Sequence, residues 1–169
     1  MTDVARLIVQ NIPRLRRYAR ALTGDDNRAD DLVQDCLERA WSRIKLWRQD
    51  DDIRAWLFTI MHNIFANLAR RHSREPVFLP LPDEDSHGAD QPLHDYALNL
   101  RDLKRALDAL PEDQREVILL IGLEQLSYQE AAHVLGIPTG TVMSRLSRGR
   151  ERLRRYLQDP PKSRIRRIK

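Results

Sequence analysis

The stretch LSYQEAAHVLGIPTGTVMSRLSRGRERLRR, residues 126–155, decides the fold of the second half of this chain. Ser127 and Glu130 have the spacing of a capping box, which predicts a helix that starts directly after Ser127. Gly136 opens a Gly-Ile-Pro turn that ends this helix, because glycine tolerates a left-handed backbone and proline cannot continue a helix. A second helix is therefore predicted from about Thr139, which makes the stretch a helix-turn-helix.

The second helix of this motif has an apolar face and a basic face. The residues predicted to face inward are Val142, Leu146, Gly149, Leu153 and Leu157. The residues on the opposite side are Ser144, Ser147, Arg148, Glu151 and Arg155. In DNA-binding proteins such a helix enters the major groove. An ordinary helical hairpin with a solvated arginine face is the alternative, but the coincidence of capping box, glycine turn and clustered arginines favours DNA.

Composition narrows the class of protein. The chain has 169 residues, a net charge of +4 and one cysteine, Cys36, in an apolar stripe. A single cysteine excludes a disulfide framework and a cysteine-rich zinc site. No pattern of a secretory signal or membrane span is visible, so we expect a cytoplasmic protein that does not insert into a membrane. No organised nucleophile, phosphate-binding glycine loop or metal-ligand spacing is visible either, which predicts no catalysis, no cofactor and no metal.

The predicted fold class is all-α, because helical periodicity recurs and strand signals are nearly absent. We expect two small helical domains joined by a flexible acidic linker, with the helix-turn-helix in the second. The predicted boundaries are 1–74 for the first domain, 75–99 for the linker, 100–159 for the second domain and 160–169 for a basic tail. The linker has four prolines, six acidic residues and no lysine or arginine. Such a composition does not support a packed core.

Three helices are predicted in the first domain, over residues 4–22, 28–44 and 53–72. Pro13 is expected to bend the first or divide it in two, and Thr23-Gly24 to end it. Asp26 or Asn27 is the expected cap of the second helix and Asp51 or Asp52 that of the third. Trp41 and Leu68 are counted among the core residues. Two further helices, over 102–110 and 111–123, precede the helix-turn-helix, with Pro111 in the first turn of the latter.

Two polar surfaces stand out on these helices. Asp31, Gln34, Asp35 and Glu38 share one side of the second helix at i, i+3, i+4 and i+7, and we call them the acidic ridge. The ridge is either a solvated face or a dock for a basic protein partner.

The second polar surface is the outer side of the third predicted helix. It carries Thr59, His62, Asn63, Asn67 and Arg70, with Arg71 and Arg74 at or beyond the helix end. Amides beside arginines suit a nucleic-acid strand, although arginines also suit a helix C-terminus through its dipole.

Two motifs in a fixed order carry a resemblance to a known family. The first is DLVQD, residues 31–35, followed by Trp41. The second runs from Leu110-Pro111 through Arg115-Glu116 to SYQEAA, residues 127–132, and GTVMSR, residues 140–145. Together they closely resemble the extracytoplasmic-function (ECF) sigma factors of bacterial RNA polymerase, over about residues 12–157.

The resemblance implies functions for both polar surfaces. It implies that the acidic ridge, Asp31, Gln34, Asp35 and Glu38, binds core RNA polymerase. It implies that the third helix and the loop 46–52 recognise the minus-ten promoter element as single-stranded DNA, with Asn63, Asn67, Arg70 and Arg71 as contacts and His62 as a weaker candidate. Such a site must unstack a base and hold it.

The helix-turn-helix would, by the same resemblance, read the minus-thirty-five element as duplex DNA. The matching positions are Thr141, Met143, Ser144, Arg145, Ser147 and Arg148. Many relatives have a basic residue at the position of Met143 and a larger side chain at that of Ser147, so readout here is expected to depend more on Arg145 and Arg148.

The resulting prediction is a promoter-specificity subunit controlled by an anti-sigma factor, with core polymerase and promoter DNA as partners. One alternative is a sigma-like decoy that titrates an anti-sigma protein, but a decoy does not need the arginines at Arg145, Arg148, Arg70 and Arg71. Another is a dimeric helix-turn-helix repressor, which would leave the first half and its acidic ridge without a function.

Overall fold

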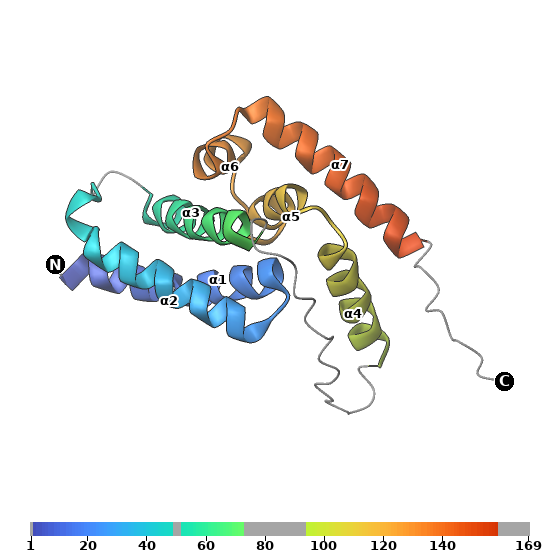
Figure 1. The fold of residues 1–169 in the computed structure, drawn as a ribbon, viewed down its shortest axis with the longest axis horizontal. Helices are drawn as coiled ribbons and strands as arrows, with labels where there is room; N and C mark the ends of the chain where they lie inside the picture. Colours follow the sequence, from blue (N-terminus) through green and yellow to red (C-terminus); the bar gives the residue numbers. More distant parts are fainter. Residues whose placement is uncertain (1, 49–51, 73–93, 159–169) are drawn as a thin grey trace.

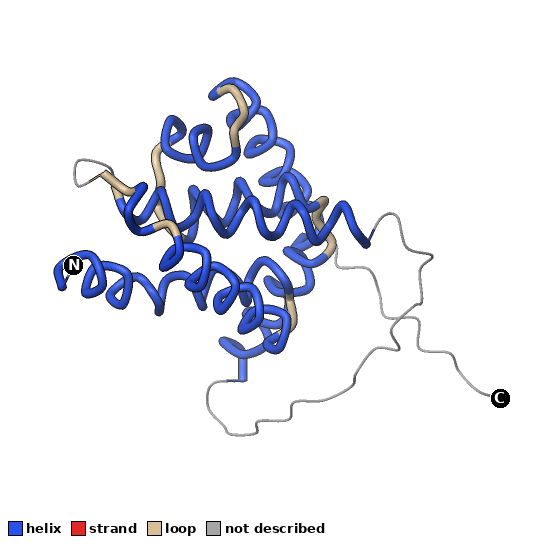
Figure 2. Tube along the Cα trace, turned by 60° about the vertical axis from the view of Figure 1, so that its left-hand side comes forward, coloured by secondary structure: helices blue, strands red, loops and turns tan. Residues whose placement is uncertain are grey.

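The computed structural model describes residues 2–48, 52–72 and 94–158. Within these ranges the chain forms helices and the turns that join them, with no strand (Figure 2). The predicted all-α fold is thus confirmed. The segments 75–93 of the predicted linker and 160–169 of the predicted basic tail lie outside the described residues.

The first half consists of helices α1 (Thr2–Thr23), α2 (Asp26–Ser42) and α3 (Ile53–His72), with a short 3-10 turn, η1 (Ile44–Leu46), after α2. α1 is one helix that includes Pro13, so the division considered at this residue does not occur. Gly24 ends α1 as predicted, because it has the left-handed φ of 69° that glycine adopts without strain. The cap of α2 is Asp25, not Asp26 or Asn27, since its Oδ1 accepts the Arg28 N–H at 2.7 Å.

Two residues predicted to be buried in this half are exposed. Trp41 is 57% exposed and Leu68 is 38% exposed. Trp41 stands one helical turn after Leu37, which is itself only half-buried. Leu37 and Trp41 therefore lie at the edge of the apolar stripe of α2 and not at its centre. Leu68 lies in the last turns of α3, where it lines a cavity instead of the core.

The second half consists of α4 (His94–Asp108), α5 (Glu112–Ile118), a π-helical turn η2 (Leu119–Leu123), α6 (Tyr128–Leu135) and α7 (Thr139–Gln158). α4 begins at His94, so residues 94–99, predicted as linker, are helical. The predicted helix 111–123 is α5 followed by η2, and Pro111 is its N-cap rather than a residue of its first turn.

The two halves pack directly against each other. α3 lies along α6, and α1 contacts η2 and α5 (Figure 1). A single apolar cluster includes Leu15 and Phe58 from the first half and Val117, Leu120 and Leu126 from the second. The minus-ten and minus-thirty-five candidates are therefore carried by one packed body in this structure.

Candidate nucleic-acid interface

The helix-turn-helix has the local geometry that the sequence predicts. The Ser127 hydroxyl accepts the Glu130 N–H at 3.1 Å, and the Glu130 carboxylate accepts the Ser127 N–H at 2.6 Å. The bond from the Ser127 N–H is the main reason that the pKa of Glu130 is lowered, with the Ser127 hydroxyl and Arg54 also contributing. Gly136 closes α6 with a φ of 62°. Both ends of α6 are thus fixed by side-chain and backbone chemistry.

Helix α7 is held close to α5, and this sets the orientation of its outer face. Gly149 is buried against α5, where a Cβ would lie 2.6 Å from Ile118 Cδ1. Val142 and Leu146 are buried as predicted, and Leu153 is half-buried. Leu157 in the last turn of α7 is 46% exposed, so the prediction that it faces inward is wrong. The opposite side of α7, with Ser147 and Arg148, is exposed to solvent.

The minus-thirty-five candidates do not share one environment. Met143 is 52% exposed, and Ser147 and Arg148 are also exposed, whereas Thr141 and Ser144 are half-buried. The Ser144 hydroxyl donates to the Thr141 carbonyl at 3.1 Å and lies 3.5 Å from Arg148 Nη2.

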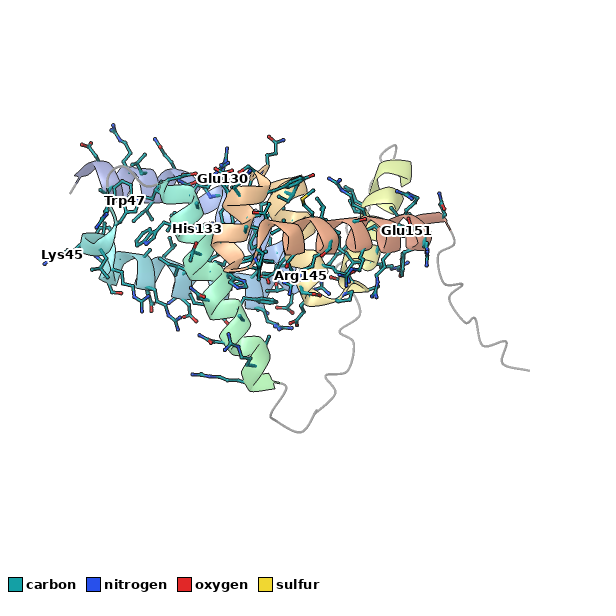
Figure 3. The ribbon with its side chains drawn as sticks, turned by 90° about the horizontal axis from the view of Figure 1, so that it is seen from above. Lys45, Trp47, Glu130, His133, Arg145 and Glu151 are labelled. Carbon is teal, nitrogen blue, oxygen red and sulfur yellow. The ribbon has the colours of Figure 1, made fainter. Side chains whose placement is uncertain are left out.

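Arg145 differs from the other candidates on α7. Its Nε lies 3.3 Å from Asp113 Oδ2 of α5, and its side chain is 30% exposed. Figure 3 shows Arg145 near the start of α7 and Glu151 further along the same helix. The ion pair with Asp113 competes with DNA for the Arg145 guanidinium, so Arg145 is suited to orienting α7 against α5. Arg148 is exposed and is better placed to contact DNA.

The minus-ten candidates lie on the outer side of α3. Asn63, Asn67, Arg70 and Arg71 are all exposed. The structure places the weaker candidate, His62, elsewhere: its Nδ1 lies 2.8 Å from Glu116 Oε1 of α5, and its side chain is only 18% exposed. Before α3, Leu46 is exposed and Trp47 is half-buried, and residues 49–51 lie outside the described ranges. Figure 3 labels Trp47 in this segment.

The acidic ridge is a solvent-facing row on α2. Asp31, Gln34, Asp35 and Glu38 are all exposed, and Gln34 Nε2 donates to Glu38 Oε1 at 3.1 Å. Three of these residues border a cavity of about 870 Å³ whose apolar wall includes Phe65 and Leu68 of α3. The ridge therefore places charged residues at the edge of an apolar patch, an arrangement like the polar rim around the apolar core of a protein interface.

Sequence reasoning missed a set of charged residues between the halves. Glu116 and Glu124 are buried, and their partners His62 and Arg17 belong to the first half. A signal existed in the sequence, since Glu116 stands next to the apolar Val117 and Glu124 next to the apolar Leu123. Buried acids require a partner, but the pattern of one chain segment does not say which.

Neither a membrane-spanning helix nor a metal-binding cluster occurs in residues 2–48, 52–72 and 94–158. No helix there is long and apolar enough to span a bilayer. No three His, Cys, Asp or Glu side chains in those ranges are grouped so as to hold a metal ion.

Comparison with protein families identifies both halves. A family model described as the Sigma2 domain of PhyR matches residues 8–62, and one described as Sigma-70, region 4, matches residues 100–153. The fold and the helix-turn-helix thus define a two-domain protein of the sigma-70 type.

Two relatives extend this match over most of the chain. The ECF RNA polymerase sigma factor EcfG of Rhodopseudomonas palustris is 38% identical over 152 residues, which cover 86% of this chain and 80% of the relative. The sigma factor SigE of Mycolicibacterium smegmatis is 36% identical over 156 residues, which cover 89% of this chain and 60% of the relative. The chain belongs to the ECF sigma factors, which are transcription initiation factors.

Solved structures agree with this assignment. The sigma factor RpoE of Bartonella quintana, solved in complex with the anti-sigma factor NepR, is 35% identical and superposes with a TM-score of 0.81. The match covers 95% of this chain and 100% of RpoE. CnrH, solved in complex with the cytosolic domain of CnrY, is 28% identical, with a TM-score of 0.69 and coverage of 93% and 88%.

Proposed function

We propose that this protein binds core RNA polymerase and directs initiation at promoters that carry its own minus-thirty-five and minus-ten elements. The observation that carries the proposal is the exposed outer face of α7 in a capped helix-turn-helix. This face belongs to a chain whose other half matches a sigma region 2 domain. Polymerase supplies the catalysis, and this chain supplies the recognition of DNA.

The minus-thirty-five element is read as duplex by α7. Arg148 is the main base-reading candidate, because its guanidinium is exposed and lies near the Ser144 hydroxyl. Arginine pairs with guanine through two hydrogen bonds in the major groove. Thr141, Met143 and Ser147 supply smaller contacts beside it. Arg145, paired with Asp113, holds α7 in register and contacts phosphate.

The minus-ten element is held as a melted strand by α3. Asn63 and Asn67 are one helical turn apart on an exposed side, so their amides can bond the edges of an unstacked base. Arg70 and Arg71 follow at the end of the same helix and suit the adjacent phosphates.

The acidic ridge docks on a basic surface of polymerase. Asp31, Asp35 and Glu38 present carboxylates along one exposed side of α2, and such a row favours a complementary positive surface. The same protein is proposed to be held inactive by an anti-sigma factor. The RpoE structure supports this, because that similar sigma factor is bound to one.

A promoter-selection experiment tests the assignment of the two DNA-reading helices. Transcription with polymerase and this protein on a library randomised at both elements is expected to yield a consensus at each. Arg148→Ala should cost about 1–3 kcal/mol of discrimination at one position of the minus-thirty-five element and leave the minus-ten consensus unchanged.

Matched variants complete the test. Arg150→Ala removes an exposed arginine about half a turn away on α7 and should leave the consensus unchanged. Asn67→Ala should relax the minus-ten consensus alone. An Arg148→Ala variant that selects the wild-type consensus at the wild-type level would remove this residue from the reading face.

A further inference from the structure

The interface between the two halves is built around two buried carboxylates of the second half. Glu124 has a side chain with no exposed surface, and its Oε1 lies 2.8 Å from Arg17 Nη2 of α1. The Glu116 side chain is 8% exposed, and its Oε1 lies 2.8 Å from His62 Nδ1 of α3. Each carboxylate therefore finds its partner only when the halves are packed together.

The polar groups at this interface are incompletely satisfied. Glu124 Oε2 is buried and has no hydrogen-bond partner in the part of the chain that the structure describes. The buried Tyr18 hydroxyl of α1 likewise has none there. Burial raises the pKa of Tyr18, and the nearby charges of Glu116 and Glu124 raise it further. Buried groups left in this state cost free energy that they would recover in water.

Two arginines fix how the halves are oriented. Arg115 of α5 donates to the Leu22 carbonyl of the first half at 2.9 Å and to the Asp108 carbonyl of its own half at 2.8 Å. Arg54 of α3 lies 3.4 Å from both the Glu124 carbonyl and Glu130 Oε1. The interface is thus specific in geometry, but the Arg17–Glu124 pair adds little net stability, because the desolvation of the buried Glu124 carboxylate opposes the attraction.

The packed arrangement does not fit a promoter that carries both elements. Positions minus thirty-five and minus ten are about 25 base pairs apart, which corresponds to about 85 Å of duplex at about 3.4 Å per base pair. α3, which carries the minus-ten candidates, contacts α6 of the helix-turn-helix directly, and packed helices lie about 8–10 Å apart. The halves must therefore separate before both elements are held.

The covalent chain permits this separation. Roughly 20 residues join His72 at the end of α3 to His94 at the start of α4, and an extended segment of that length reaches about 70 Å. The length of the halves themselves adds to this reach. Opening therefore depends on the contacts between the halves.

We propose that the Arg17–Glu124 ion pair and the His62–Glu116 hydrogen bond form a latch that fixes how the apolar contacts between the halves fit together, and so keeps the free protein closed and autoinhibited before any anti-sigma factor binds. This inference rests on the proposed function. The inhibition is geometric, because Arg148 and Asn67 remain exposed in the closed form but cannot reach their two elements together. Polar pairs that are specific in geometry and add little net stability suit this task, since they select one closed arrangement and still release it.

Fluorescence energy transfer in the full chain tests the latch. Dyes are attached through Lys45→Cys of η1 and His133→Cys of α6, both exposed (Figure 3), in a Cys36→Ala background. Arg17→Ala leaves the Glu124 charge buried without its partner and should shift the ratio of open to closed molecules about tenfold toward open. Arg16→Ala, which removes an exposed neighbouring arginine, should leave energy transfer unchanged.

A compensating variant separates opening from misfolding. Arg17→Met combined with Glu124→Met replaces the pair by apolar side chains and should restore closure to the wild-type level or beyond. Run-off transcription at limiting polymerase should rise with Arg17→Ala and fall again with the double variant. Equal energy transfer in Arg17→Ala and Arg16→Ala, or opening without a gain in transcription, would overturn the latch. Absence of transcripts with every variant, while energy transfer still responds, would instead overturn the proposed function.

Discussion

Gly149 offers a quantitative test of how α7 is seated on α5. A Cβ at this position would lie 2.6 Å from Ile118 Cδ1 and 3.4 Å from Gln114 Cβ. Overpacking of this kind costs about 1–3 kcal/mol, and alanine regains about 1 kcal/mol over glycine inside a helix. We therefore expect Gly149→Ala to lower the free energy of unfolding by about 1 kcal/mol, which lowers the Tm by about 2–4 °C in a chain of this size.

Thermal and urea unfolding measure this loss, and two variants control it. Gly140→Ala adds a methyl group where no atom lies within 4 Å, so it should not destabilise the protein. Ile118→Val removes the Cδ1 that the new methyl would meet. A double-mutant cycle of Gly149→Ala with Ile118→Val should therefore show a favourable coupling of at least about 0.5 kcal/mol. Strict additivity, together with a Gly149→Ala variant as stable as Gly140→Ala, would refute the close approach of the two helices.

Three further predictions concern other residues. The buried thiol of Cys36 has its pKa raised to about 12, chiefly by burial, so iodoacetamide at pH 8 should modify it only after unfolding; rapid labelling of the native protein would contradict its burial. Because the pKa of Glu130 is lowered in the folded protein, its carboxylate contributes its full stabilisation above pH 4.5, the ordinary pKa of glutamate, and loses it as the pH falls below that value. Glu130→Gln should therefore flatten the pH dependence of the free energy of unfolding in that range. An unchanged acid profile would argue against the capping box. Asp35→Arg should abolish capture by core polymerase with unchanged helical circular dichroism, whereas Asp3→Arg in the first turn of α1 should not; normal capture by Asp35→Arg would remove the ridge from the polymerase interface.

The parts of the fold that were predictable are those encoded locally. Ser127, Glu130 and Gly136 define the ends of α6 through interactions within a few residues, so the structure confirms them. α3 has the predicted bounds because its apolar stripe is long and regular. α4 begins at His94, earlier than predicted, because the acidic and proline-rich composition around it concealed its helical register.

The parts that were not predictable depend on residues far apart in the chain. Trp41 is a large aromatic residue at the edge of an apolar stripe, so its residue type favours burial. Only the packing of α2 against its neighbours shows that it is exposed. His62 shares the helical face of the minus-ten candidates, yet it pairs with Glu116, which is distant in sequence. Periodicity assigns a residue to a face of its helix but does not say what covers that face.

The central claim is that this chain confers promoter specificity on polymerase, and run-off transcription tests it most directly. Purified bacterial core polymerase is supplied with a pool of promoter fragments, with and without the protein. The account predicts discrete transcripts only when the protein is present, with start sites that share one element near minus ten and one near minus thirty-five. A protein that fails to bind core, or that binds a palindromic duplex tightly as a dimer without polymerase, would contradict it.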